Sequence, residues 1–351
     1  MKKMKLVILI VVAWLLLVGV YQTQKKLPEK TNFRGKERDI AIEQVEFLHD
    51  LTYKNPDGKI ISEQRIFDEI FFLIQNARTY ILIDVFLFNS YTRQTDKIYR
   101  NIAAELTEKL VIKKRAVPDI KIDFITDPIN TVYGGDASEE LEQLKAAGIN
   151  VIVTDLKRLP DSNPIYSAIW RTFIQWFGNS PQKGLVPHPF SGGGQKVTLR
   201  SYFDMINFKA NHRKIFLADN GEGATLIITS GNPHNGSAAH SNIALKITGG
   251  IWRDVYESEA AVAKFSGREL QAPTGIVDKS PRLEAGRAKI VFLTENQIKR
   301  ELLARIRETT ANDSIQMAHF YLADRHIIEE LVYASERDVR IKVILDPNKD
   351  A

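Results

Sequence analysis

Three polar residues near the middle of the chain have the types and spacing that phosphodiester chemistry needs. The stretch NHRKIFLADN, residues 211–220, places His212 and Lys214 two positions apart and Asp219 five positions further on. A neutral imidazole can attack phosphorus, and a lysine ammonium can hold the non-bridging oxygens on which negative charge develops. The same residue types also occur singly on solvated strands, so their meaning depends on the elements that carry them.

The sequence around these residues predicts a β-hairpin. Residues 214–218 and 224–230 have the composition of two strands, and the glycine-rich residues 220–223 between them form a turn. Because side chains alternate along a strand, His212 and Lys214 share one face, and Ser230 and Asn232 share a face of the returning strand. We therefore expect four polar groups to converge.

The complete set resembles the phospholipase D superfamily, whose signature is H-x-K-x4-D followed by a Gly/Ser-x-Asn element. His212, Lys214 and Asp219 match the first part, and Ser230 and Asn232 match the second. The interval between the two parts is somewhat longer than in the family, and the extra residues fall in the turn, where they leave both strands in register. The resemblance covers the chain from about residue 62 to its end.

The resemblance implies a two-histidine mechanism that uses no metal and no other cofactor. In the family two H-x-K motifs meet at one site, where one histidine forms a phosphohistidine and the other protonates the leaving alcohol. By this resemblance the catalytic set is His212, Lys214 and Asp219, with His212 as nucleophile and Asp219 as a positioning partner. The substrate phosphate is bound by Lys214, Ser230 and Asn232.

The partner histidine is missing from the sequence. His319 and His326 have Tyr321 and Ile328 where the motif requires lysine, and we interpret both as structural. The remaining histidines also lack the pattern: His49, His188, His234 and His240. Of these, His234 is close enough to Asn232 to line the pocket. We expect the second motif from a C-terminal half beyond residue 351 or from a homodimer partner.

The surrounding sequence alternates helix and strand patterns, which predicts an α/β fold. Residues 65–88 read as a helix followed by a strand rich in Ile, Val and Phe, and residues 119–128 and 149–154 as further buried strands. Helical patterns over 94–112 and 138–147 separate these strands. The alternation predicts layers of helices and strands, and the resemblance implies a mixed β-sheet with helices on both faces.

Part of this unit recurs near the end of the chain. ARTYILIDVFLF (77–88) corresponds to ANDSIQMAHFYL (311–322), and DIKIDFITDP (119–128) corresponds to DVRIKVILDP (338–347). We therefore expect three parts: a membrane anchor or signal segment with a basic linker over 1–38, a first phospholipase D-like lobe over 39–290, and the truncated beginning of a second lobe over 291–351.

The first 38 residues carry the membrane and charge signals. Fifteen apolar residues run from Leu6 to Val20, about 22 Å as a helix, which is short for a hydrocarbon core of roughly 30 Å. The residues before Tyr21 match a cleavage site poorly, and the flanking aromatic residues suit interfacial positions. Both observations favour an anchor, and we expect an extracytoplasmic body.

Residues 1–38 hold nine Lys or Arg and two Glu, a net charge of +7, so the rest of the chain carries −2 of the total of +5. A slightly acidic body is atypical of a nuclease, and the absence of cysteine excludes disulfides.

A segment between the last strand of the α/β unit and the motif gives the best indication of the substrate. In NPIYSAIWRTFIQWFGN (163–179), six apolar residues fall on one helical face: Tyr166, Ile169, Trp170, Phe173, Trp176 and Phe177. Such a face either packs into a core or lies in a membrane interface. The following stretch 184–197 is typical of a mobile loop.

The sequence thus predicts a membrane-bound enzyme that cleaves phospholipid phosphodiesters through a phosphohistidine. It acts either by phosphatidyl transfer, similar to bacterial cardiolipin synthases, or by hydrolysis to phosphatidic acid; both routes share the phosphohistidine and the residues leave them open. The alternatives are a phospholipase D-type nuclease, which would bind nucleic acid, and a non-catalytic membrane-bound lipid-binding protein.

Overall fold

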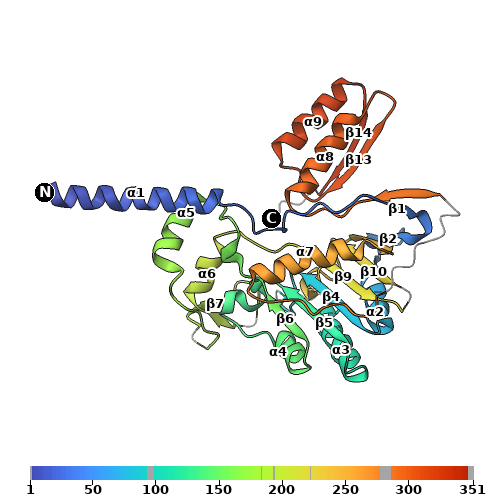
Figure 1. The fold of residues 1–351 in the computed structure, drawn as a ribbon, viewed down its shortest axis with the longest axis horizontal. Helices are drawn as coiled ribbons and strands as arrows, with labels where there is room; N and C mark the ends of the chain where they lie inside the picture. The colour runs from blue at the N-terminus through green and yellow to red at the C-terminus, as the bar shows by residue number, and fades with distance from the viewer. Residues whose placement is uncertain are drawn as a thin grey trace. The chain divides into compact units, whose positions relative to one another are not determined.

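The chain folds as two compact units (Figure 1). The computed structural model describes residues 2–92, 99–182, 184–192, 194–221, 223–276 and 286–346. Unit 1 comprises Met1–Lys30 and Glu37–Ile290, and unit 2 comprises Thr31–Lys36 and Val291–Ala351.

Unit 1 is built around a mixed sheet of eight strands in the order β3-β2-β11-β10-β9-β4-β5-β6. The strands β4, β5 and β6 run parallel to one another, and all other neighbours in this sheet are antiparallel. The mixed sheet expected from the resemblance is therefore confirmed. Its strands are β2 (Val45–Lys54), β3 (Ile60–Gln64), β4 (Tyr80–Val85), β5 (Lys121–Thr126), β6 (Asn150–Val153), β9 (Lys214–Asp219), β10 (Ala224–Thr229) and β11 (Asn242–Thr248).

Helices cover both faces of the sheet, as expected. Apolar side chains of one face, among them Ile83 and Phe216, form a core with α2 (Arg65–Asn76), α3 (Ile102–Ala116) and α4 (Glu139–Ala146). The alternate residues of the same strands face α7 (Trp252–Phe265), where the ring of Tyr80 meets that of Tyr256 edge-on at 6.2 Å. Because β4 is buried on both faces, its sequence is an apolar run interrupted by Asp84 and shows no regular polar alternation.

The segment between β6 and β9 forms an irregular helical layer. It contains η3 (Leu156–Arg158), α5 (Pro164–Ile169), the π-helical turn η4 (Trp170–Ile174) and α6 (Leu199–Met205). Residues 184–197, expected as a mobile loop, hold the two-stranded ribbon of β7 (Val186–Pro187) and β8 (Lys196–Val197). The helix expected over 94–112 begins at Ile102, and residues 93–98 lie outside the described part of the chain.

Short elements complete unit 1. The strand β1 pairs antiparallel with β12. Three helical turns connect the longer elements. These segments are β1 (Arg38–Ala41), β12 (Arg287–Ile290), η1 (Ile42–Gln44), η2 (Pro128–Gly134) and η5 (Asn235–Ser237).

The N-terminal helix α1 (Lys2–Gln24) is longer than its apolar run. Its 23 residues span about 34 Å at 1.5 Å per residue, enough for a hydrocarbon core of roughly 30 Å. Within the described residues it is the one helix that is long and apolar enough to cross a membrane. Its composition fits a membrane anchor or a signal sequence.

Unit 2 repeats the element order that opens the sheet of unit 1. Its elements are α8 (Asn296–Glu308), β13 (Ser314–His319), α9 (Arg325–Glu336) and β14 (Arg340–Leu345). The two strands pair in parallel, as β4 and β5 do in the helix–strand–helix–strand series α2, β4, α3, β5.

Candidate active site

The H-x-K motif lies at the start of a central strand. Strand β9 begins at Lys214, which pairs with Val85 at the end of β4. On its other side β9 forms the predicted hairpin with β10, in which Asp219 pairs with Ala224 across the turn. Gly221 in this turn has a φ of 78°, which favours glycine, and Glu222 lies outside the described residues. The longer turn therefore leaves the two strands in register.

His212 and Lys214 meet at the ring of Phe86, the residue that follows β4. His212 is partly exposed, and the centroid of its imidazole ring lies 4.7 Å from that of Phe86. The Nζ atom of Lys214 lies 5.5 Å from the Phe86 centroid and donates to the His212 carbonyl at 3.0 Å. The structure thus brings these two predicted site residues together.

The surroundings of this pair set the protonation states that nucleophilic attack requires. Burial, with a smaller effect of the Lys214 ammonium, lowers the pKa of His212 to about 4. Burial lowers the pKa of Lys214 to about 8, against the opposing attraction of Asp84. At neutral pH the imidazole is therefore unprotonated and has a free lone pair, while most of the lysine still carries its proton.

Asn232 is fixed beside the same segment. Its Oδ1 atom accepts from the backbone N–H of Leu87 at 3.2 Å, so the residue is held next to Phe86. This bond uses the oxygen and leaves the side-chain NH₂ group without a hydrogen-bond partner among the described residues. The NH₂ group can donate to a phosphate oxygen.

The structure places Ser230 differently from the expectation of four converging groups. Its hydroxyl donates to Asn242 Oδ1 at 3.0 Å and accepts from the Ile243 N–H at 3.1 Å. Both contacts are to β11, and continuing the β9–β10 register sets Thr229 across from Lys214. Ser230 therefore ties the end of β10 to β11 and is not aligned with the H-x-K pair.

Asp219 is separated from the other two residues of its motif. Five strand positions place it about 17 Å from Lys214 and on the opposite face of the sheet. Its buried carboxylate accepts hydrogen bonds from the backbone N–H groups of residues 78, 79 and 80, at 3.0, 2.8 and 2.9 Å respectively. The aspartate fixes the entry into β4, which agrees with a positioning role.

Two buried carboxyl groups hold the residue just before His212. The Asn211 N–H donates to Asp127 at 2.8 Å, and its side-chain NH₂ donates to both oxygens of Asp84 at 2.9 Å. Burial raises the pKa of Asp127 to about 7, and burial together with the charge of Glu259 raises the pKa of Asp84 well above its usual range. Sequence analysis missed these residues, although an ionisable residue, Asp84, within the apolar run ILIDVF was a local signal.

The residue just after the histidine is held by α7. The Arg213 guanidinium donates to Glu259 at 2.8 Å and to the Ser258 hydroxyl at 3.0 Å. The Glu259 side chain is fully buried and that of Arg213 nearly so. The Glu259 carboxylate therefore pairs with the Arg213 guanidinium inside the protein. The backbone on both sides of His212 is therefore anchored to buried groups.

A cavity of about 350 Å³ opens beside the motif. Phe86, Leu87, Tyr91, Phe190 and His234 are among the residues that line it. The His234 Nδ1 atom lies 3.3 Å from the Asn89 carbonyl, and burial lowers the pKa of this histidine. His234 thus lines this cavity, whereas His212, Lys214 and Asn232 are not among its lining residues.

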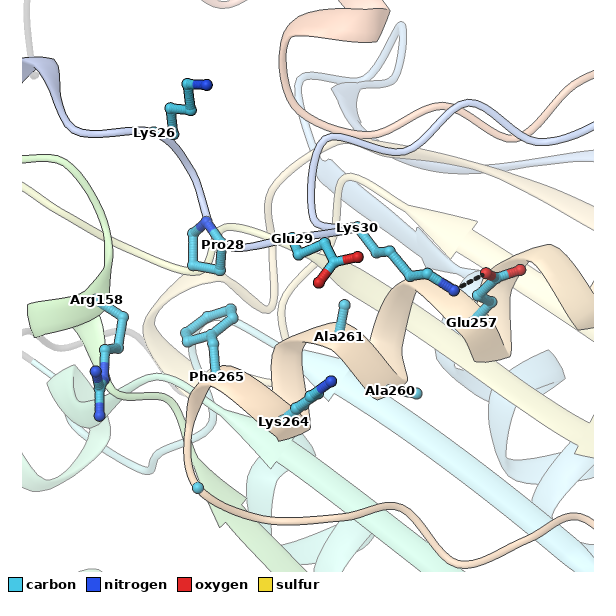
Figure 2. A pocket seen from close by; sticks show the side chains of 11 residues that line it. Lys26, Pro28, Glu29, Lys30, Arg158, Glu257, Ala260, Ala261, Lys264 and Phe265 are labelled. Atoms are coloured by element: carbon cyan, nitrogen blue, oxygen red, sulfur yellow. Dashed lines mark hydrogen bonds and ion pairs between the residues drawn. The ribbon is translucent and has the colours of Figure 1, made fainter.

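A larger cavity, of about 680 Å³, lies elsewhere in unit 1 between the linker and α7. Figure 2 shows Lys30 reaching Glu257 at 2.7 Å, which ties the linker to this helix. None of the motif residues lines this cavity. The cavity lies where the segment that follows α1 runs along α7.

The two histidines of unit 2 lack a lysine two positions further on, although Lys299 Nζ lies 3.2 Å from His326 Nδ1. His319 and His326 are exposed, and His326 lies at the start of α9, where its N–H donates to Asp324. Among the described residues no group of three or more His, Asp or Glu side chains has an arrangement that could hold a metal ion.

A family of known proteins matches the C-terminal part of the chain. Residues 302–351 match the family described as cardiolipin synthase, PLD-like domain. This segment lies outside the H-x-K motif, so the resemblance to the phospholipase D superfamily is confirmed by a second part of the sequence. The match supports phosphodiester chemistry of this superfamily and leaves the substrate and the reaction open. No curated protein matches the chain.

Solved structures give weaker similarities. Phosphatidylserine synthase from Haemophilus influenzae Rd KW20 aligns with 90% of this chain at 11% identity and a TM-score of 0.47, and the chain spans 64% of its length. The phospholipase D family member Nuc from Salmonella typhimurium aligns with 64% of this chain, which covers 92% of Nuc, at 14% identity and a TM-score of 0.29. NucT from Helicobacter pylori aligns with 64% of this chain, which covers 99% of NucT, at 13% identity and a TM-score of 0.31.

Proposed function

We propose that this chain provides one half of a phospholipase D-type active site that cleaves phospholipid phosphodiesters at a membrane. The observation that carries the proposal is the pairing of a neutral His212 with a charged Lys214 at the Phe86 ring. An imidazole that is unprotonated at neutral pH is a competent nucleophile, and an adjacent cation favours the dianionic charge that builds on phosphorus oxygens.

In the first step a lone pair of the His212 imidazole forms a bond to phosphorus while the bond from phosphorus to the headgroup oxygen breaks. The Lys214 ammonium and the Asn232 NH₂ hold the non-bridging oxygens. The departing alkoxide takes a proton from a general acid, the histidine of a second H-x-K motif, which a C-terminal half or a second copy of this chain supplies.

In the second step an oxygen nucleophile attacks the phosphohistidine. Its oxygen–phosphorus bond forms, the phosphorus–nitrogen bond breaks, and its proton passes to the partner histidine, so His212 leaves neutral. Water yields phosphatidic acid, and a lipid alcohol yields a new diester as in cardiolipin synthesis. The buried anchors of Asn211 and Arg213 act here by holding the backbone of His212 still.

The helix α1 supports the assignment of a lipid substrate because it would keep the site at a bilayer. It is 23 residues long with a mean hydropathy of 2.6 over its most apolar window. The slightly acidic body, with −2 outside residues 1–38, disfavours the nucleic-acid alternative.

Release of lipid headgroup by the full-length protein in mixed micelles tests the proposal. Phosphatidylglycerol is the probe, His212→Ala the variant, and His240→Ala, an exposed histidine outside the motif, the matched control. We expect His212→Ala to abolish glycerol release and the control to retain it. Retained release in folded His212→Ala overturns the assignment. A protein that binds the lipid without release in any variant is the non-catalytic alternative.

A further inference from the structure

The irregular helical layer exposes a large apolar surface. Residues 164–177, which contain α5 and η4, turn five large apolar side chains to the outside of unit 1: Ile165, Ile169, Phe173, Trp176 and Phe177. Trp176 is 75% exposed, Ile165 76% and Phe173 53%. Single exposed apolar residues are ordinary, but five within thirteen positions form a contiguous patch that favours a non-aqueous partner.

The opposite face of the same segment is fixed to the body. Trp170 and Ala168 are buried, and the Arg171 guanidinium pairs with Asp161 at 2.7 Å, with both side chains almost fully covered. The sequence left open whether the aromatic face packs inward or lies in an interface. The structure divides the set: Trp170 packs inward, and the half-buried Tyr166 donates its hydroxyl to the Phe203 carbonyl. The remaining members are exposed: Ile169, Phe173, Trp176 and Phe177.

The same segment packs against the end of α1. Gly19 is buried there, and a Cβ atom at this position would lie 2.5 Å from the Pro164 carbonyl oxygen. The Asp161 N–H donates to the Gln22 carbonyl at 2.9 Å, and Lys25 Nζ donates to the Lys157 carbonyl at 2.7 Å. Figure 1 shows α5 beside the C-terminal end of α1.

The position of this contact along α1 identifies the partner. Gly19 precedes the last residue of the helix, Gln24, by five positions, which is about 7 Å along the axis. The exposed Lys26 follows two positions after the helix end, and a lysine at such a position extends to the headgroup level. If α1 crosses a bilayer, α5 lies just below the headgroups, at the depth of roughly 5–10 Å where the apolar faces of interfacial helices reside.

We propose that residues 164–177 form an interfacial element that inserts Ile165, Phe173 and Trp176 into the same lipid leaflet from which α1 emerges. The inference rests on the proposed membrane anchorage and not on the phosphodiester chemistry. Phe177 also lines a cavity of about 250 Å³ that reaches Pro128, the neighbour of Asp127. The exposed apolar surface therefore borders this cavity through Phe177.

The absence of cysteine from the chain allows a clean test with single-cysteine variants. Phe173→Cys and Trp176→Cys, each labelled with an environment-sensitive NBD group, are compared with Phe72→Cys on α2, where Phe72 is 62% exposed. The full-length protein is reconstituted in phosphatidylcholine–phosphatidylglycerol vesicles with and without brominated acyl chains. We expect a blue-shifted emission and at least about twofold quenching at positions 173 and 176, and neither effect at position 72.

A further variant tests the coupling to the anchor. Gly19→Val adds a side chain where the Pro164 carbonyl already lies, so it should push α5 away and reduce quenching at position 173 while carbonate extraction still leaves α1 in the membrane. Quenching by brominated chains at positions 173 and 176 that is no greater than at position 72 overturns the inference. An unshifted emission then means that the patch is in water, and a blue shift without quenching means that a second copy covers it. Quenching unchanged by Gly19→Val overturns the role of α1. Headgroup release is measured in parallel, so a failure of the chemistry is distinguished from a failure of insertion.

Discussion

Replacing Phe86 by alanine is expected to raise the pKa of His212 from about 4 toward its ordinary value of 6.5. The Phe86 ring lies 4.7 Å from the imidazole and forms one wall of its environment. Loss of the ring admits water, which weakens the main cause of the lowered pKa, whereas the smaller effect of Lys214 remains. We therefore expect a rise of about one pH unit, to a value still below 6.5. The pKa of Lys214 rises from about 8 by the same mechanism.

The assay is an NMR titration of protein labelled with ¹³C at the histidine Cε1 atoms, with the His212 signal assigned by its absence in His212→Ala. It reads the pKa directly and does not depend on a second motif. The rate constant kcat/KM of an active preparation gives the functional counterpart: activity rises with pH as His212 loses its proton and falls as Lys214 loses its own, so both limbs move to higher pH in the variant. Phe72→Ala on the surface of α2 is the control. A His212 pKa near 6.5 in the unaltered protein, or one of about 4 that persists in Phe86→Ala, refutes the reasoning.

Three further predictions concern the groups around the pair. Glu259→Ala removes the buried carboxylate that pairs with Arg213 and should lower the free energy of unfolding by about 3 kcal/mol in urea denaturation, with a smaller loss for Glu259→Gln. Equal stability of Glu259→Ala and the unaltered protein contradicts the importance of this pair. Asp219→Ala removes the acceptor of three backbone N–H groups and should lower the free energy of unfolding by about 3 kcal/mol, measured in the same way. Headgroup release per folded molecule should be unchanged. Loss of release in a variant of unchanged stability would show that Asp219 takes part in the reaction. Lys214→Met should reduce kcat by about 100-fold or more with the fold intact by circular dichroism, because the cation that stabilises the phosphorus oxygens is gone; a loss below tenfold contradicts its role.

The parts of the site that depend on local sequence were predictable. The hairpin follows from two strand patterns around a glycine-rich turn, and the alternation of side chains places His212 and Lys214 together. The Ser230 expectation went wrong at the point where the ladder ends: beyond Ile228 the chain no longer pairs with β9, and the hydroxyl turns to Asn242 instead.

The parts that depend on distant partners were not predictable from patterns. The antiparallel half of the sheet joins Asn242 to Asp50, and no periodicity indicates which strands pair across such a separation. The ion pair of Arg213 with Glu259 joins residues 46 positions apart. The full length of α1 was also underestimated, because the helix continues through polar residues on both sides of the apolar run.

The most direct test of the central claim is to trap the covalent intermediate. Full-length protein is mixed with phosphatidylglycerol, quenched in alkali, where phosphohistidine is stable, and mapped by tandem mass spectrometry after proteolysis. The account predicts a phosphatidyl adduct on the imidazole of His212 and on no other histidine, absent in His212→Ala and present in His240→Ala. Turnover of the lipid with an adduct on a different residue, or with no adduct at His212 under conditions that slow the second step, would contradict it.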